Sequence, residues 1–394
     1  MHRHQRRAHP LGSSPRRRPR GLTLVELLLS GSLGVVVMVA AVAMLLAAGR
    51  MRRNQQLLSD ANEEARTALR GVTRALVSAG AGGSMFYFFD SKGNPSLGSA
   101  IAFKNGTVAL SDPTLLQMPD ELVVVRYLAD RRTDLVRPLG GTTLSVAPDP
   151  RPSTVPGAMP KVFNDTGDSA FVTNFKRALL LPVEGATLDS GSSVVNLSVP
   201  AGDPVTLLGD PEKLQKQINI EPGASVFAVQ VVRYRVVYVP PAGQNPARTD
   251  LVMESLVPST ILDPEPKVKY STLLAHDVED FQVQWAYDND GDGAPDAFDD
   301  QGPSASFLNQ ELAFARISLS ARTTSALIAE SGLVSQGAAK GKGLFIPGAK
   351  DLTPFELGLD KDLGGNPKPK NEDGYRHRVM STVVMLKNVA APRL

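Results

Sequence analysis

An acidic segment at residues 288–299 is the first candidate for chemistry in this sequence. Its carboxylates stand at positions 1, 3, 5, 9 and 12 of a twelve-residue segment, and a glycine stands at position 6. Ca²⁺ takes six to eight oxygen ligands, and alternate residues of a tight loop can turn their carboxylates inward. The pattern therefore predicts a Ca²⁺ loop. Its expected ligands are Asp288, Asp290, Asp292, the carbonyl of Ala294, Asp296 and Asp299.

Two features separate this segment from a paired EF-hand. Position 12 is Asp299, whose shorter side chain favours monodentate or weaker binding than the usual glutamate. Pro295 lies inside the segment, and no second helix pattern follows it. An isolated Ca²⁺ loop after a strand, similar to those of dockerins or thrombospondin repeats, fits these features. The alternative is a solvated acidic turn.

A single carboxylate near the N-terminus is the second candidate. Between Leu22 and Gly49 the only charged residue is Glu26. As a helix this stretch is roughly 42 Å long, more than the ~30 Å hydrocarbon core of a bilayer. A carboxylate in such a segment costs about 2.5–3.5 kcal/mol on insertion scales. We therefore expect a positive charge to meet Glu26.

The residues around this stretch indicate its orientation. Residues 1–20 contain seven arginines and no acid, which predicts a cytoplasmic N-terminus. Arg50, Arg52 and Arg53 follow the apolar run and mark the far interface. Proteolysis after Gly21 would create a cationic amine at Leu22, about one helical turn from Glu26.

The segment Gly21-Leu22-Thr23-Leu24-Val25-Glu26, after a basic leader, resembles the prepilin motif of type IV pilins and type II secretion pseudopilins. The resemblance implies that a prepilin peptidase cuts after Gly21 and N-methylates Leu22. It also implies that Glu26 guides assembly by pairing with the terminus of a neighbouring subunit. Leu22 stands where phenylalanine is usual. The alternatives are an ordinary signal peptide and a plain membrane anchor.

Residues 62–66, 120–127, 314–322 and 383–388 resemble elements of the PilW group of minor pilins. The resemblance implies a structural subunit of a type IV pilus or a secretion pseudopilus. Its implied partners are other pilins or pseudopilins, the prepilin peptidase, an inner-membrane assembly platform and the lipid bilayer. The implied location is the inner membrane, crossed once, and then the fibre, with the large domain periplasmic or extracellular.

The helix pattern continues beyond the apolar run. Small or apolar residues recur every three to four positions up to Ala79, before Gly80, Gly82 and Gly83. We expect a leader at residues 1–21 and a helix at residues 22–80, of which 22–49 is transmembrane and the rest amphipathic. Two helices with a break near Gly49 or Gly71 are the alternative.

Residues 81–394 carry the patterns of an exported β-rich domain. The expected strands cover residues 121–128, 193–199, 204–208, 225–239, 251–257, 280–287, 312–321 and 375–387. No alternation of helices and strands separates them, which favours antiparallel sheets packed on the helix. The interval 130–220 is weakly patterned, and we expect an insertion there. The predicted fold class is α+β and pilin-like.

Composition argues against several function classes. The chain has no cysteine, so disulfides and thiol chemistry are excluded. The net charge of +2 does not call for a nucleic-acid partner. Only His276 and His377 follow the leader, neither has a metal-ligand companion at a suitable spacing, and no nucleophile elbow or phosphate loop occurs. We therefore expect no enzyme. The rival hypotheses are a pilus-tip adhesin with a Ca²⁺-stabilised domain and an anchored exported enzyme.

Overall fold

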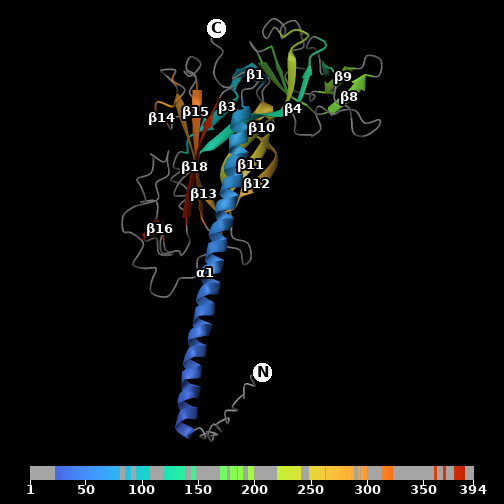
Figure 1. Ribbon diagram of the computed structural model, residues 1–394. Helices are drawn as coiled ribbons and strands as arrows, with labels where there is room; N and C mark the ends of the chain where they lie inside the picture. Colours follow the sequence, from blue (N-terminus) through green and yellow to red (C-terminus); the bar gives the residue numbers. More distant parts are fainter. Residues whose placement is uncertain are drawn as a thin grey trace, which may run out of the picture. The chain divides into compact units, whose positions relative to one another are not determined.

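A single long helix opens the described part of the chain. The computed structural model describes residues 23–79, 85–89, 95–106, 119–137, 143–147, 169–174, 178–183, 185–189, 194–198, 220–240, 248–261, 263–287, 292, 294–299, 312–322, 359–361, 367–369 and 377–386. Helix α1 spans Leu24–Ser78 and runs without a break through Gly49 and Gly71 (Figure 1). The chain therefore adopts one helix here, and the alternative of two helices is wrong.

The chain divides into two compact units, Met1–Gln55 and Gln56–Leu394. In the first unit the apolar side chains of α1 are exposed on all sides; Leu28 is 64% exposed and Val36 is 65% exposed. A helix of a soluble core would bury such side chains. This part of α1 is long and apolar enough to cross a membrane.

In the second unit α1 is buried on one side only. The buried residues recur every three to four positions, and most of them are alanines. Because alanine side chains are short, they allow a helix axis to lie close to the elements packed on it. The buried residues of α1 are Ala61, Ala65, Ala68, Leu69, Val72, Ala75 and Leu76.

A nine-stranded sheet forms the largest part of the domain. Its centre is β10 (Ser225–Val239), a 15-residue strand that pairs with three neighbours. Every pairing in the sheet is antiparallel except that of β1 with β7. The other strands are β1 (Met85–Phe89), β2 (Pro95–Ser99), β3 (Ile101–Lys104), β4 (Glu121–Asp134), β6 (Ser169–Thr173), β7 (Ala178–Pro182), β11 (Arg248–Leu256) and β12 (Val268–Ala275).

The other described strands form three smaller antiparallel sheets. The four-stranded sheet has the order β14 (Phe298–Asp299), β13 (Val278–Tyr287), β15 (Leu312–Arg322), β18 (His377–Met385). The three-stranded sheet has the order β5 (Thr143–Val146), β9 (Val194–Ser198), β8 (Gly185–Asp189). β16 (Leu359–Lys361) and β17 (Pro367–Pro369) form a hairpin, and a 3₁₀ turn, η1, covers Pro258–Thr260.

One hydrophobic core joins α1 to both of the larger sheets. The buried face of α1 shares this core with Val124 and Tyr234 of the nine-stranded sheet and with Phe281 and Ile317 of the four-stranded sheet. A second core, which includes Leu144, packs the three-stranded sheet on β6, β7 and β10. The described domain is therefore α+β, with sheets that depend on each other and on the helix.

A buried carboxylate reinforces the junction of the two larger sheets. Asp120 is 2% exposed and lies directly before β4. Its Oδ2 accepts a hydrogen bond from the backbone N–H of Val283 at 2.7 Å, and its Oδ1 accepts one from Gly106 at 3.0 Å. Its own N–H donates to the carbonyl of Phe281 at 2.9 Å. A single residue thus ties the start of β4 and the end of β3 to β13.

The long strands were predicted well, and most of the short ones were missed; the expected strand 193–199 corresponds to the short β9. The predicted strand 225–239 coincides with β10, and the strands expected at 280–287 and 312–321 correspond to β13 and β15. The interval 130–220 contributes β6 and β7 to the nine-stranded sheet, and β5, β8 and β9 to the three-stranded one. The expected strand 204–208 lies outside the described residues.

Substitution Asp120→Ala should lower the free energy of unfolding by about 3 kcal/mol, because it leaves buried N–H groups without their charged acceptor. Urea unfolding of the full chain in detergent, followed by the fluorescence of the single tryptophan, Trp285, measures this. The matched control is Asp134→Ala, whose side chain is 61% exposed and whose loss should cost about 0.5 kcal/mol or less. Equal losses for the two variants would contradict the role of Asp120.

Candidate functional site

The described helix begins with a reciprocal pair of hydrogen bonds. Thr23 precedes α1, and its backbone N–H donates to Glu26 Oε2 at 3.0 Å. The N–H of Glu26 donates in return to Thr23 Oγ1 at 3.3 Å, and the Thr23 hydroxyl also bonds Oε2 at 3.1 Å. This is a capping box, in which a threonine and the glutamate three residues later satisfy amide groups that the first helical turn leaves open.

The capping box gives Glu26 a local structural role that the sequence analysis missed. The signal was present, because Thr23 and Glu26 have the Thr-x-x-Glu spacing ahead of an apolar run. Both bonds that Glu26 accepts use Oε2, so its Oε1 is left open among the described residues. The predicted cleavage residues Gly21 and Leu22 lie outside the described residues.

The acidic segment forms the connection between two paired strands. β13 leads into it, and β14 returns to pair with β13 through Trp285 opposite Asp299 and Ala286 opposite Phe298. The N–H of Asp296 donates to the carbonyl of Tyr287 at 3.1 Å. The base of the loop is thus held by backbone hydrogen bonds.

A cation–π contact holds the same end of the loop on the sheet. The guanidinium carbon of Arg316, on β15, lies 3.7 Å from the centroid of the Phe298 ring. An arginine at this distance is attracted electrostatically by the negative face of the ring. Arg316 also donates to the side-chain oxygen of Gln284 at 3.3 Å. Gln284 lies on β13, so this strand helps to orient the guanidinium group over the Phe298 ring.

Three of the five predicted carboxylate ligands lie within the described residues. Asp292, Asp296 and Asp299 are exposed, and Asp292 Oδ1 accepts the N–H of Ala294 at 2.8 Å. Asp288 and Asp290 lie outside the described residues. Within the residues that the structure does describe, no three His, Asp or Glu side chains come together as a set of metal ligands.

Tyr287 lies where β13 enters the loop. Burial, and then the neighbouring Asp299 carboxylate, raise the pKa of the Tyr287 phenol above its usual value. A phenol is already neutral at physiological pH, and the shift makes its ionisation still less favourable. It places no additional negative charge at the base of a loop that already carries several carboxylates.

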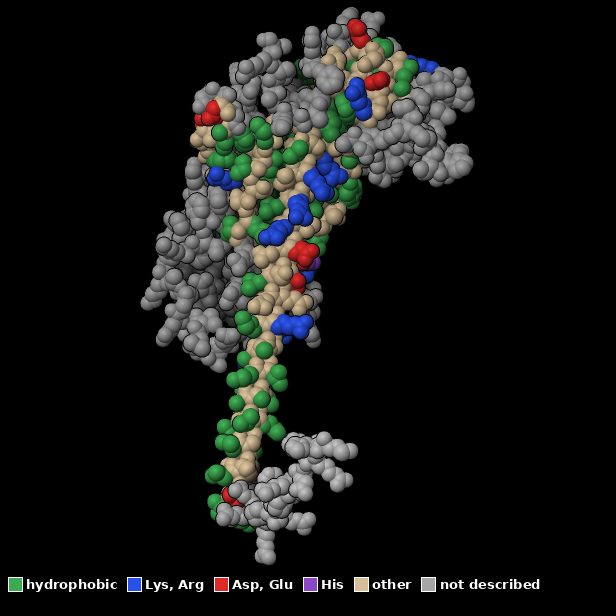
Figure 2. Space-filling model, in the orientation of Figure 1, with side chains coloured by type: hydrophobic (Ala, Val, Ile, Leu, Met, Phe, Trp, Pro, Cys, Tyr) green, Lys and Arg blue, Asp and Glu red, His purple; other side chains and the backbone are tan. Residues whose placement is uncertain are grey.

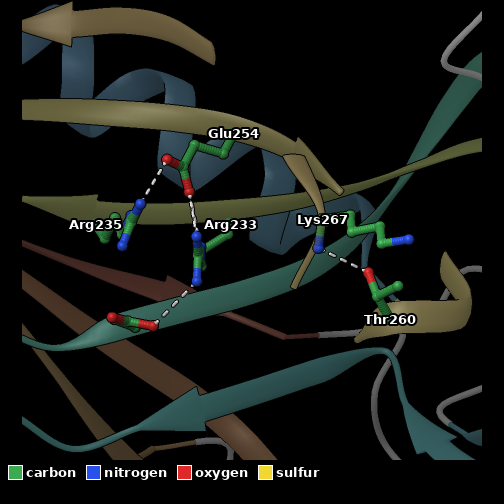
Figure 3. A network of polar contacts seen from close by, with 6 residues as sticks. Arg233, Arg235, Glu254, Thr260 and Lys267 are labelled. Carbon is green, nitrogen blue, oxygen red and sulfur yellow. Dashed lines mark hydrogen bonds and ion pairs between the residues drawn. The ribbon is translucent and has the colours of Figure 1, made fainter. Parts of the chain in front are cut away.

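A second group of charges, centred on the buried Arg233 and Glu254, lies on the nine-stranded sheet (Figure 3). Arg233 of β10 lies opposite Glu254 of β11, and its Nε and Nη2 approach Glu254 Oε2 at 2.8 and 2.7 Å. Arg235 Nη2 approaches Glu254 Oε1 at 2.9 Å, and Arg233 Nη1 lies 3.7 Å from Glu121 Oε2. Two cations and two anions balance, and both oxygens of Glu254 have partners, whereas Arg235 Nε is buried without a hydrogen-bond partner.

Beside this network, η1 is tied back to the chain that leads into β12. The backbone N–H of Lys267 donates to the hydroxyl of Thr260 at 2.9 Å (Figure 3). Thr260 is buried and its hydroxyl in turn donates to the carbonyl of Val257 at 2.9 Å. These contacts fix the turn between β11 and β12, and they are structural.

His276 lies at the connection between β12 and β13. Its Nδ1 is 3.2 Å from Asp250 Oδ1, and its backbone N–H donates to Glu64 Oε2 of α1 at 3.0 Å. Asp250 Oδ2 also accepts from Arg248 Nε at 3.1 Å. The next residue, Asp277, has φ of 51° in the left-handed region, which accommodates the turn. His276 thus helps to hold α1 against the strand connection.

Comparisons of the chain with models of known protein families, with curated proteins and with solved structures found no match.

Substitution Glu254→Ala should lower the free energy of unfolding by about 3–5 kcal/mol, since it leaves the buried Arg233 without its nearest counter-charge. The double variant Arg233→Met with Glu254→Leu should be more stable than Glu254→Ala, because no unpaired buried charge remains. Urea unfolding of the full-length variants in detergent measures both. If the double variant were less stable than Glu254→Ala, the attraction between Arg233 and Glu254 would contribute more to stability than the unpaired Arg233 costs.

Proposed function

We propose that this chain is a minor pilin or pseudopilin, a structural subunit of a type IV pilus or a type II secretion pseudopilus. A prepilin peptidase removes residues 1–21 and N-methylates Leu22. The apolar part of α1 holds the subunit in the inner membrane, with the N-terminus cytoplasmic and the pilin-like β-rich domain on the far side. An assembly platform then moves the subunit into a fibre of other pilins or pseudopilins.

The placement of Glu26 is the observation that carries this proposal. It is the one charged residue in the apolar run between Leu22 and Gly49, and its side chain is exposed on α1. In lipid such a carboxylate is costly unless a positive charge meets it. A new amine at Leu22 of a neighbouring subunit supplies that charge.

The capping box is a competing reason for an acidic residue at position 26. The two roles are compatible because the hydrogen bonds from Thr23 both go to Oε2. No described residue bonds the other oxygen, Oε1. That oxygen is therefore available to the amine of a neighbouring subunit. Glutamine also serves in a capping box. The variant Glu26→Gln therefore separates the cap from the charge.

Substitution Glu26→Gln should leave membrane insertion intact and reduce the amount of subunit in sheared fibres at least about tenfold, equivalent to roughly 1.4 kcal/mol. Quantitative immunoblotting of membrane and fibre fractions measures both quantities. Glu26→Ala, which loses the cap as well, should be at least as deficient. The matched control is Thr23→Ala, which removes the hydroxyl of the cap and keeps the charge. Normal incorporation of Glu26→Gln would mean that the charge of Glu26 has no role in assembly and that the residue serves only as a helix cap.

The mature N-terminus tests the proposal most directly. Intact-mass and peptide mass spectrometry of the membrane-purified protein should find a chain that begins with N-methylated Leu22. A chain that begins at Met1, or downstream of residue 40, would rule out a terminal amine near Glu26. In either case the assembly role would be wrong.

We further propose that the acidic loop binds Ca²⁺. The spacing of its carboxylates supports this, and so does a loop base that is fixed by β14, by the Tyr287 carbonyl and by the contact of Arg316 with Phe298. A fixed base lowers the ordering entropy that a ligand must overcome. Bound Ca²⁺ would stabilise the domain and relieve the repulsion between the loop carboxylates.

Ca²⁺ at about 100 times its dissociation constant should stabilise the folded chain by about 2.7 kcal/mol, and EDTA should reverse this. The paired substitutions Asp292→Asn and Asp296→Asn should abolish the effect. Thermal unfolding with and without Ca²⁺ and calorimetric titration measure it. Asp134→Asn, outside the loop, should respond as the unaltered chain does. The same stabilisation in the loop variant would place the ion elsewhere.

A further inference from the structure

The chain that leaves β3 contains the single Asn-Gly pair of the sequence, Asn105-Gly106. Asparagine followed by glycine is especially prone to spontaneous deamidation, because glycine has no side chain to hinder the approach of its backbone nitrogen to the asparagine side chain. Both residues are partly exposed, so water reaches them. The covalent structure of the chain can therefore change here without an enzyme.

Deamidation of such a pair passes through a cyclic imide. The backbone nitrogen of Gly106 loses its proton and attacks Cγ of Asn105, so that a new C–N bond forms. The bond from Cγ to Nδ2 breaks, and the released nitrogen takes up a proton and leaves as ammonia. Water then opens the imide at either carbonyl and gives aspartate or isoaspartate. Water is the only other reactant.

A buried carboxylate holds the nitrogen that would attack. The N–H of Gly106 donates to Asp120 Oδ1 at 3.0 Å, and Asp120 is 2% exposed. The other carboxylate oxygen accepts the N–H of Val283 at 2.7 Å, and the N–H of Asp120 donates to the carbonyl of Phe281 at 2.9 Å. Since Val283 and Phe281 belong to β13, this strand fixes the position of the acceptor for Gly106.

Asp120 opposes the first step of deamidation in two ways. The Gly106 nitrogen must give up its hydrogen bond to Oδ1 before it can approach Asn105 Cγ. The negative charge of Asp120 also disfavours loss of the Gly106 proton, because an anion would form beside an anion. Carboxylates at the surface, such as the red side chains in Figure 2, are screened by water and salt, whereas a buried charge is screened much less.

We propose that Asn105 is a site of spontaneous deamidation and that the Asp120 carboxylate keeps it intact in the folded protein. Conversion would place a second negative charge close to Asp120, and isoaspartate would also lengthen the main chain just before the Gly106 nitrogen. Both changes weaken the junction of β3, β4 and β13, so a modified junction does not close again. The inference does not depend on the proposed function, since it concerns the integrity of the domain and not its assembly.

Incubation of full-length chains in detergent at mildly alkaline pH tests the proposal. Peptide mass spectrometry with fragmentation separates asparagine, aspartate and isoaspartate at position 105. Conversion in Asp120→Ala should be at least about tenfold faster than in the unaltered chain, equivalent to roughly 1.4 kcal/mol of activation free energy. Equal rates would overturn the proposal. Slower conversion in the variant would mean that Asp120 acts as a base toward Gly106, which would overturn it as well.

A matched control separates the loss of the hydrogen bond from a general loss of stability. Glu254→Ala should be at least as destabilised as Asp120→Ala, but it leaves the contacts of Gly106 in place. Asn105 should convert in Glu254→Ala at least about fivefold more slowly than in Asp120→Ala, equivalent to roughly 1 kcal/mol. Equal conversion in the two variants would show that unfolding alone exposes Asn105.

A second variant tests the chemical route. Gly106→Ala, combined with Asp120→Ala, adds a Cβ that hinders closure of the imide, so it should slow conversion relative to Asp120→Ala alone. The fluorescence of the buried Trp285 reports whether each variant is folded. Unchanged conversion in the folded double variant, or aspartate without any isoaspartate, would exclude the imide and with it the role of the Gly106 nitrogen.

Discussion

The packing of the alanine-rich face of α1 against two sheets constrains the rest of the domain. Short side chains at Ala68 and Ala75 let the helix share one core with the nine-stranded and the four-stranded sheets. A bulky residue on that face would separate the layers. The same rotational setting of the helix turns Arg70 and Arg74 outward. Burial of one side of α1 thus determines which side chains the opposite side exposes to a partner.

Several charges lie where water cannot solvate them fully, and the described ones have identifiable partners. Asp120 accepts hydrogen bonds from the backbone N–H groups of Val283 in β13 and of Gly106 after β3, and Glu254 is paired with two arginines. Glu26 differs, because its cap with Thr23 occupies one oxygen only. A buried charge with a complete set of partners is structural. A carboxylate on an apolar helix with an open oxygen is the better candidate for an intermolecular contact.

The sequence predicted those elements that are long and rich in residues typical of one kind of secondary structure. β10 could be predicted because it is long, β-branched and aromatic, and α1 because its apolar residues change from all-round to one-sided. β6 and β7 were missed because they are short and buried on both faces, so no alternation marks them. The exposed edge strand β12 was missed for the opposite reason, since seven of its eight side chains are at least partly exposed without a regular order.

The sequence by itself determined the one-charge apolar run, the basic leader, the spacing of the acidic segment and the order of charges along α1. These are local properties, because they depend on residue types and their separation along the chain. The tertiary structure decided that Glu254 meets Arg233, that Asp120 joins two sheets, and that β14 and Arg316 fix the base of the acidic loop. These contacts link positions tens to more than a hundred residues apart or depend on strand register, which only the packing of the sheets can set.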